Sequence, residues 1–130
     1  MIRVSSITQH YGVKPVLRDV DLSIGPGELV GILGPNGMGK TTLLSALAGV
    51  LKPQKGYVEI NGQRRRSSID AERDIRRKVL FLPDHPWLPR NRTGREFLLS
   101  VGRLYEIDEN RLIEHVEKLL QLFELDRLAD

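Results

Sequence analysis

The sequence predicts a mixed α/β fold in which a glycine-rich loop joins a buried strand to a helix, beside an antiparallel sheet. Three observations support this prediction. A short apolar run at residues 28–33 precedes the loop, and a Leu- and Ala-rich stretch at residues 42–50 follows it. Segments on both sides of this unit have strand patterns and end at turn residues. From residue 93 onward, apolar residues recur at helical spacing, which predicts a helical region.

The first two strands are predicted at residues 2–8 and 16–24. Apolar and polar residues alternate in the first, and in the second Val20, Leu22 and Ile24 share one face. Tyr11-Gly12 forms the turn between them. Gly25-Pro26-Gly27 ends the second strand, and the buried strand at residues 28–33 follows.

The glycine-rich stretch at residues 34–42 fits a pattern of a glycine, four free positions and then Gly-Lys-Thr. Glycines allow close backbone approach to a polyphosphate, and the helix that follows adds partial positive charge. Lys40 can reach the β- and γ-phosphates, and the Thr41 hydroxyl can bind Mg²⁺. Because the flanking strand and helix disfavour an ordinary glycine turn, we expect nucleoside triphosphate binding. The candidate binding residues are Gly34, Pro35, Asn36, Gly37, Met38, Gly39, Lys40, Thr41 and Thr42.

Another hairpin, a helix and a second buried run are predicted after the loop. Residues 57–60 form a strand that ends at Asn61-Gly62, a strong hairpin signal. Residues 67–77 are polar and predict a short helix with Ile69, Ala71 and Ile75 inward. Residues 79–82 are a second candidate strand for a parallel core sheet.

The last third of the chain is predicted to be helical. Thr93 and Glu96 form a capping box that opens a helix through about Tyr105, and Asp108 caps the next helix. The apolar residues expected to line the core side of that helix are Leu112, Val116, Leu119 and Phe123, with Ile113 and Leu120 beside them.

Composition indicates a soluble globular domain. The chain has 130 residues, 40% of them hydrophobic and 28% charged, and it contains no cysteine that would form disulfides or thiolate metal sites. No apolar run is long enough to cross a bilayer, and the N-terminus lacks the apolar centre of a signal peptide. We therefore expect a cytoplasmic location.

The charge balance of +3 is weak evidence for an anionic partner. Basic residues cluster at residues 64–66 and 76–78, and a solvated hairpin and helix face is the favoured interpretation. Contact with anionic lipid or RNA remains open, but no aromatic residues are interleaved to stack on bases. A nucleic-acid partner is not expected.

Several motifs together resemble the first half of the ATP-binding domain of ABC transporters. Tyr11, in Gln-His-Tyr-Gly, matches the aromatic residue that stacks on adenine in that family. The stretch at residues 16–28 matches the approach to the phosphate loop, residues 34–42 match the loop itself, and residues 56–62 match the hairpin after it. The sequence around residues 82–84 and 104–106 is most similar to ATPase subunits of bacterial multidrug or ABC-2 exporters.

The resemblance implies a P-loop NTPase (RecA-like) core with an antiparallel β-subdomain and the start of an α-helical subdomain, in a truncated chain. The implied domains are an α/β nucleotide-binding core at residues 1–83, a loop at residues 84–92 and the beginning of the helical subdomain at residues 93–130. The implied cofactors are ATP and Mg²⁺. Lys40 would serve catalysis, and Thr41 would bind the metal.

Two departures from the family pattern limit the expected activity. Asp84 stands where the family has a glutamine that contacts Mg²⁺ and the attacking water; a carboxylate can bind Mg²⁺, but Asp84 after a proline also fits a plain turn. The family's signature, its Mg²⁺-binding aspartate strand with the glutamate after it, and the switch histidine are absent. We therefore expect a fragment that binds ATP but has little or no turnover alone.

The resemblance also implies partners and leaves alternatives open. A transmembrane permease subunit would contact residues 85–92, including Trp87 and Leu88, although Trp87 can equally pack against its own helical region. A second nucleotide-binding domain would complete a head-to-tail dimer at the inner face of the membrane. The alternatives are a regulatory module that binds nucleotide without hydrolysis, and a soluble ABC-type ATPase acting on the ribosome or DNA.

Overall fold

A computed structural model describes residues 1–85 and 88–130. The chain divides into two compact units, Met1–Phe81 and Leu82–Asp130, which are described separately below. This division concerns packing alone, and the three-part domain organisation expected from the sequence remains a prediction.

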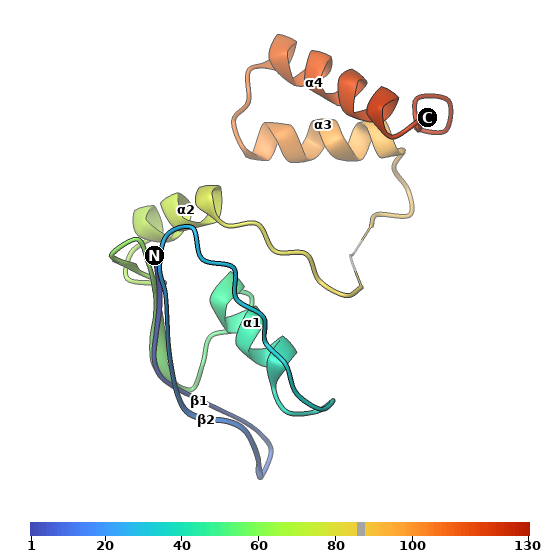
Figure 1. Cartoon of the computed structure of the whole chain (residues 1–130). Coiled ribbons are helices and arrows are strands. Elements are labelled where there is room, and N and C mark those ends of the chain that lie inside the picture. Colours follow the sequence, from blue (N-terminus) through green and yellow to red (C-terminus); the bar gives the residue numbers. More distant parts are fainter. Residues whose placement is uncertain (86–87) are drawn as a thin grey trace. The chain divides into compact units, whose positions relative to one another are not determined.

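Unit 1 contains a four-stranded antiparallel sheet with the order β2-β1-β3-β4. Figure 1 shows β1 and β2 running side by side in it. Val58 and Ile60 alternate with their neighbours and point into a core that also contains Val4 and Ile7; helix α1 contributes Leu43 and Ala46 to it, and helix α2 contributes Ile75. The strands and helices of this unit are β1 (Ile2–Tyr11), β2 (Lys14–Ile24), α1 (Lys40–Ala48), β3 (Lys55–Ile60), β4 (Gln63–Arg64) and α2 (Ile69–Lys78).

The β1–β2 pair is bent by irregular pairing near its middle. Ser6 and Asp19 have positive φ angles of 47° and 46°, and the regular register is interrupted between Val4 and Ile7. Side chains accept from both displaced N–H groups, at 2.8 Å from Ser6 N to Asp21 Oδ1 and 3.0 Å from Asp19 N to Thr8 Oγ1. The bend therefore leaves neither backbone donor unpaired.

The two apolar runs predicted to be buried parallel strands are not strands. Residues 28–33 and 79–82 pair with no described segment. Leu29 and Leu33 are almost fully exposed, as are Leu80 and Leu82. A strand satisfies its backbone groups through a hydrogen-bonded neighbour, and no described residues supply one to either run. Only Ile32 and Val79 pack against the core of unit 1.

Helix α2 confirms one predicted inward residue and corrects another. The Ser68 side chain accepts from the Ala71 N–H and caps the helix. Ile75 is fully buried, whereas Ile69 is 82% exposed. At about 100° per residue, Ile69 and Ile75 point to different sides of the helix, while Ala71 and Ile75 share a face. The predicted inward position of Ile69 is therefore wrong.

Unit 2 is a helical hairpin of α3 (Gly94–Leu104) and α4 (Glu109–Leu122). The predicted capping box of Thr93 and Glu96 is present, and Asp108 caps α4. The buried face of α4 consists of Leu112, Val116 and Leu120, which pack with Ala129. Leu119 and Phe123 are exposed, against prediction: Leu119 lies at the edge of this face, and Phe123 is the C-cap residue beyond the end of α4.

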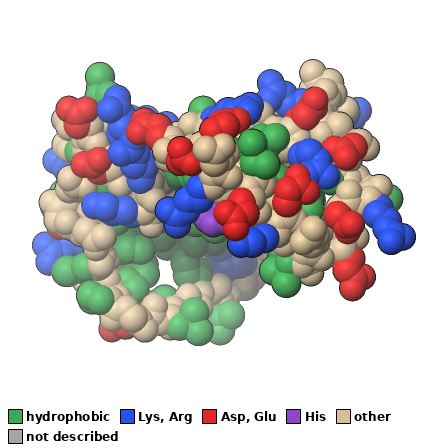
Figure 2. All heavy atoms as spheres, turned by 90° about the horizontal axis from the view of Figure 1, so that it is seen from above, with side chains coloured by type: hydrophobic (Ala, Val, Ile, Leu, Met, Phe, Trp, Pro, Cys, Tyr) green, Lys and Arg blue, Asp and Glu red, His purple; other side chains and the backbone are tan. Residues whose placement is uncertain are grey.

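The surface carries mixed charge. Figure 2 shows basic and acidic side chains interspersed on the visible face, with hydrophobic side chains also reaching the surface. Among the described residues, no helix combines the length and the apolar character that crossing a membrane requires.

Candidate functional site

The glycine-rich loop forms a turn that leads directly into α1. Gly34, Gly37 and Gly39 have φ angles of 154°, 82° and 90°, which side-chain-bearing residues rarely adopt. Gly39 is the N-cap of α1 and supplies no side-chain hydrogen bond, and the first turn of the helix contains no acidic residue. The N–H groups at this helix end are thus left for another acceptor.

Lys40, the first residue of α1, folds its side chain over the loop. Its Nζ donates to the carbonyl oxygen of Gly34 at 2.7 Å and to that of Pro35 at 2.8 Å. The ammonium group is therefore placed over the same turn whose N–H groups lack side-chain caps. A positive charge and free backbone donors at one helix N-terminus suit an anionic group such as a phosphate.

Strand β2 supports the loop from behind. A Cβ added to Gly39 would lie 2.8 Å from the Val16 carbonyl oxygen and 2.9 Å from Leu17 Cδ2. Position 39 thus requires glycine both for its φ angle and for close packing on β2. The supporting role of Val16 and Leu17 was not predicted, because it depends on how two distant segments pack.

A hollow of about 380 Å³ adjoins the loop. Gly34, Asn36, Gly37, Met38 and Thr41 are exposed and open to a ligand. The structure thus brings the predicted loop residues together in one turn. The hollow is lined by Leu17, Val20, Ile32, Leu33, Gly34, Pro35, Met38, Gly39, Lys40 and Leu43.

Tyr11 lies at the end of β1, where it pairs with Lys14 across the hairpin turn. It is 56% exposed. Figure 1 shows the β1–β2 turn and the loop before α1 at the same lower end of unit 1. An exposed ring at this end is available for stacking, and its role stays a prediction.

The remaining predicted site residues belong to unit 2. Asp84 and His85 are exposed in a bend, and Leu88 is 61% exposed. Trp87 lies outside the described residues. Within the described part of the chain, no group of three His, Cys, Asp or Glu side chains could hold a metal ion.

The opposite end of α1 is held by two arginines. Arg65 Nε donates to the Leu47 carbonyl at 2.8 Å, and Arg66 Nη2 donates to the Gly49 carbonyl at 2.9 Å. Cations at this end of a helix also oppose its partial negative charge. Arg65 is buried, so the predicted solvated face at residues 64–66 is wrong for its central residue.

Glu72 joins Arg65 to α2. Its carboxylate accepts from Arg65 Nη1 at 2.9 Å, from the Arg66 N–H at 3.0 Å and from Arg76 Nε at 3.2 Å. Burial by itself would raise the pKa of Glu72, but these hydrogen bonds and the nearby arginine charges together lower it. Burial also lowers the pKa of Arg65, against the opposing effect of Glu72.

Comparison with known proteins connects this site to one family. The family model described as "ABC transporter" matches residues 17–130. The chain is 34% identical over 127 residues to the daunorubicin resistance ATP-binding protein DrrA3 of Streptomyces coeruleorubidus, covering 95% of this chain and 38% of that protein. It is 37% identical over 134 residues to the sulfate/thiosulfate import ATP-binding protein CysA of Methylococcus capsulatus, covering 99% of this chain and 37% of that protein.

A solved structure agrees with the sequence relatives. The ATP-binding cassette MJ0796, solved as a post-hydrolysis dimer bound to ADP and Pi, superposes with a TM-score of 0.83 at 27% identity, covering 99% of this chain and 60% of that one. The predicted α/β fold class is thereby confirmed. The chain spans between about a third and three fifths of the length of these relatives.

Proposed function

Because this chain belongs to the ABC transporter family and matches its ATP-binding domain, we propose that it binds ATP at residues 34–42 as part of a transporter's ATPase subunit. The observation that carries the proposal is the loop geometry. Three glycines with positive φ lead into a helix without a side-chain cap, and Lys40 holds its ammonium group over the turn. Backbone donors and a cation at one helix N-terminus are what a polyphosphate needs.

Each proposed site residue has a chemical role. Lys40 binds the β- and γ-phosphates, Thr41 offers its hydroxyl to Mg²⁺, and the Tyr11 ring stacks on adenine. Bound Mg²⁺ would neutralise charge on the phosphate oxygens. Asp84 stands at the position of the family's glutamine and would hold the metal or its water through a carboxylate oxygen.

Hydrolysis and transport are proposed for the whole protein. Positioned water and charge stabilisation around the γ-phosphate are required beyond the cradle. We propose that a second domain, arranged head to tail, and residues beyond those of this chain supply them. A transmembrane subunit contacting residues 85–92 would hold the protein at the inner face of the membrane. Export is the proposed direction, because residues 82–84 and 104–106 resemble exporter subunits.

ATP turnover tests this proposal. The chain of residues 1–130 is expected to bind ATP with little or no hydrolysis, and the full-length protein with its membrane subunit is expected to hydrolyse it. Asp84→Gln in the full-length protein should retain Mg·ATP binding. Full ATP turnover by residues 1–130 alone would contradict the proposal that other residues complete the catalytic site. If no membrane protein were associated with the purified full-length protein, a soluble ATPase would be favoured.

A further inference from the structure

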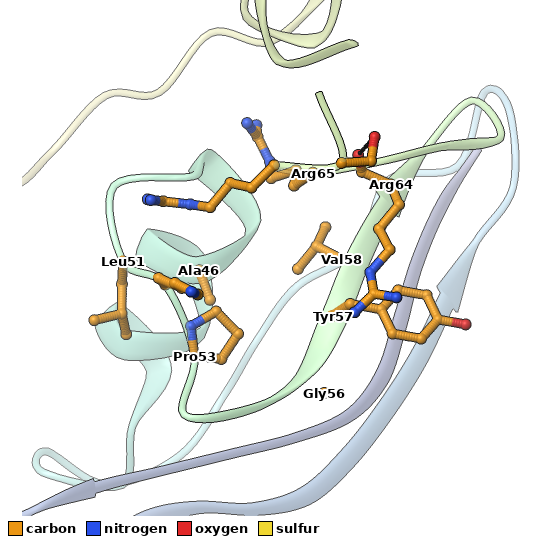
Figure 3. A pocket seen from close by; sticks show the side chains of 11 residues that line it. Ala46, Leu51, Pro53, Gly56, Tyr57, Val58, Arg64 and Arg65 are labelled. Atoms are coloured by element: carbon orange, nitrogen blue, oxygen red, sulfur yellow. Dashed lines mark hydrogen bonds between the residues drawn. The ribbon is translucent and has the colours of Figure 1, made fainter. Parts of the chain in front are cut away.

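A second cavity, of about 300 Å³, lies away from the phosphate loop, between the C-terminal part of α1 and the β3–β4 hairpin (Figure 3). It shares no lining residue with the loop at residues 34–42. This volume is at the lower end of small-ligand pockets, which hold roughly 300–1,000 Å³. Its apolar lining consists of Ala46, Leu51, Pro53, Tyr57 and Val58, and its basic lining of Lys52, Arg64, Arg65 and Arg66.

Arg65 provides a buried donor in the wall of this cavity. Its side chain is only 5% exposed. Nε and Nη1 bind the Leu47 carbonyl and Glu72, but the buried Nη2 has no hydrogen-bond partner among the described residues. A buried guanidinium N–H without an acceptor is unfavourable. An acceptor that bound this N–H would remove that cost.

Lys52 and Arg64 add positive charge to the wall, whereas the charge of Arg65 is paired with Glu72. The Arg64 guanidinium carbon lies 4.3 Å from the centre of the Tyr57 ring, and Figure 3 shows this side chain extended across the ring. Lys52 is exposed at the cavity. Several cations beside an apolar surface attract a negatively charged group and also accommodate an uncharged part of the same molecule.

We propose that this cavity binds a small organic anion, with its phosphate or carboxylate group facing Lys52, Arg64 and Arg65 and a compact apolar part against Tyr57 and Leu51. Two features of the ligand follow from the lining. The negative group is required because the wall is basic, and an apolar group adds affinity because the rest of the lining is carbon-rich. The proposal does not depend on nucleotide binding at residues 34–42.

Titration with model ligands, followed by NMR, tests the proposal. In the intact protein labelled with ¹⁵N-arginine, the Arg65 Nε–H signal is assigned by its loss in Arg65→Lys. Phenyl phosphate and benzoate are the anionic probes, and their relative affinities distinguish a phosphate from a carboxylate ligand. Benzyl alcohol lacks the charge, and inorganic phosphate lacks the apolar part. Saturable shifts are expected with at least one of the two aromatic anions, with weaker binding of both partial probes.

Two lysine variants locate the binding. Lys52→Gln should weaken binding of the aromatic anion by roughly threefold, because it removes one solvent-exposed charge. Lys55→Gln removes the same charge from a neighbouring residue that does not line the cavity, and should leave the dissociation constant unchanged. Lys40→Ala, which alters the phosphate loop, should also leave the Arg65 titration unchanged. No saturable shift with either aromatic anion, equal binding of benzyl alcohol, or equal effects of the Lys52 and Lys55 variants would overturn the proposal.

Discussion

The substitution Gly39→Ala tests how the phosphate loop is held against β2. Gly39 has a φ of 90°, and a Cβ there would lie 2.8 Å from the Val16 carbonyl oxygen. Gly37 is a matched control in the same loop, because its φ is 82° but a Cβ there would meet nothing within 4 Å. The two alanine variants therefore share the backbone strain, and only one of them adds a steric clash.

The expected loss of stability follows from these two contributions. A left-handed backbone conformation costs a non-glycine residue about 1–2 kcal/mol. Inserting a methyl group into close-packed surroundings costs a further ~1–3 kcal/mol. Gly37→Ala should therefore lower the free energy of unfolding by about 1–2 kcal/mol, and Gly39→Ala by roughly 2–5 kcal/mol. The difference between the variants measures the contact with β2.

Urea unfolding followed by circular dichroism gives both values from the shift in midpoint, provided that the slope is unchanged. The full-length protein is the appropriate material, with nucleotide absent so that binding does not affect stability. Equal losses in the two variants would refute the reasoning, because they would mean that position 39 does not pack closely on β2.

Three further predictions concern α2, the adenine contact and α3. Because the fold lowers the pKa of Glu72, its contribution to stability should be complete above its unfolded-state pKa of about 4.3 and lost as the pH falls through the lower folded value. Glu72→Gln should thus lower the free energy of unfolding by about 3 kcal/mol at pH 7, because it leaves Arg65 with a weaker partner. A loss of stability in denaturant titrations that did not depend on pH would contradict this. Tyr11→Ala should weaken the binding of ATP more than the binding of inorganic triphosphate, as measured by calorimetry. Equal losses of affinity for the two ligands would make Tyr11 a structural residue. Thr93→Ala should lower the free energy of unfolding by about 1 kcal/mol through loss of the α3 cap, and an unchanged urea midpoint would argue against that cap.

Features that depend on adjacent residues could be predicted from the sequence. The phosphate loop is a continuous pattern, and its glycines and Lys40 lie in one turn as expected. The capping box at Thr93 and the cap at Asp108 are likewise local, since a side chain accepts from an N–H three residues onward. The hairpin turn at Asn61-Gly62 joins β3 and β4 for the same reason.

Features that depend on distant partners could not be predicted. The apolar run at residues 28–33 has strand composition, but composition does not supply a neighbouring strand. Arg65 lies within three consecutive arginines, a pattern that predicts a solvated face. Its burial results from the packing of α1, α2 and the β3–β4 hairpin. The exposure of Phe123 follows from the end of α4 at Leu122, a boundary that apolar spacing alone does not mark.

Calorimetric titration with Mg·ATP tests most directly the claim that residues 34–42 bind nucleotide through their phosphate contacts. We compare the full-length protein with Lys40→Ala and with Lys55→Ala, an exposed lysine on β3 outside the loop. Loss of one charged hydrogen-bond donor to a phosphate should weaken binding about tenfold or more in Lys40→Ala, with little change in Lys55→Ala. Equal affinity of the wild-type protein and Lys40→Ala for Mg·ATP would contradict the account.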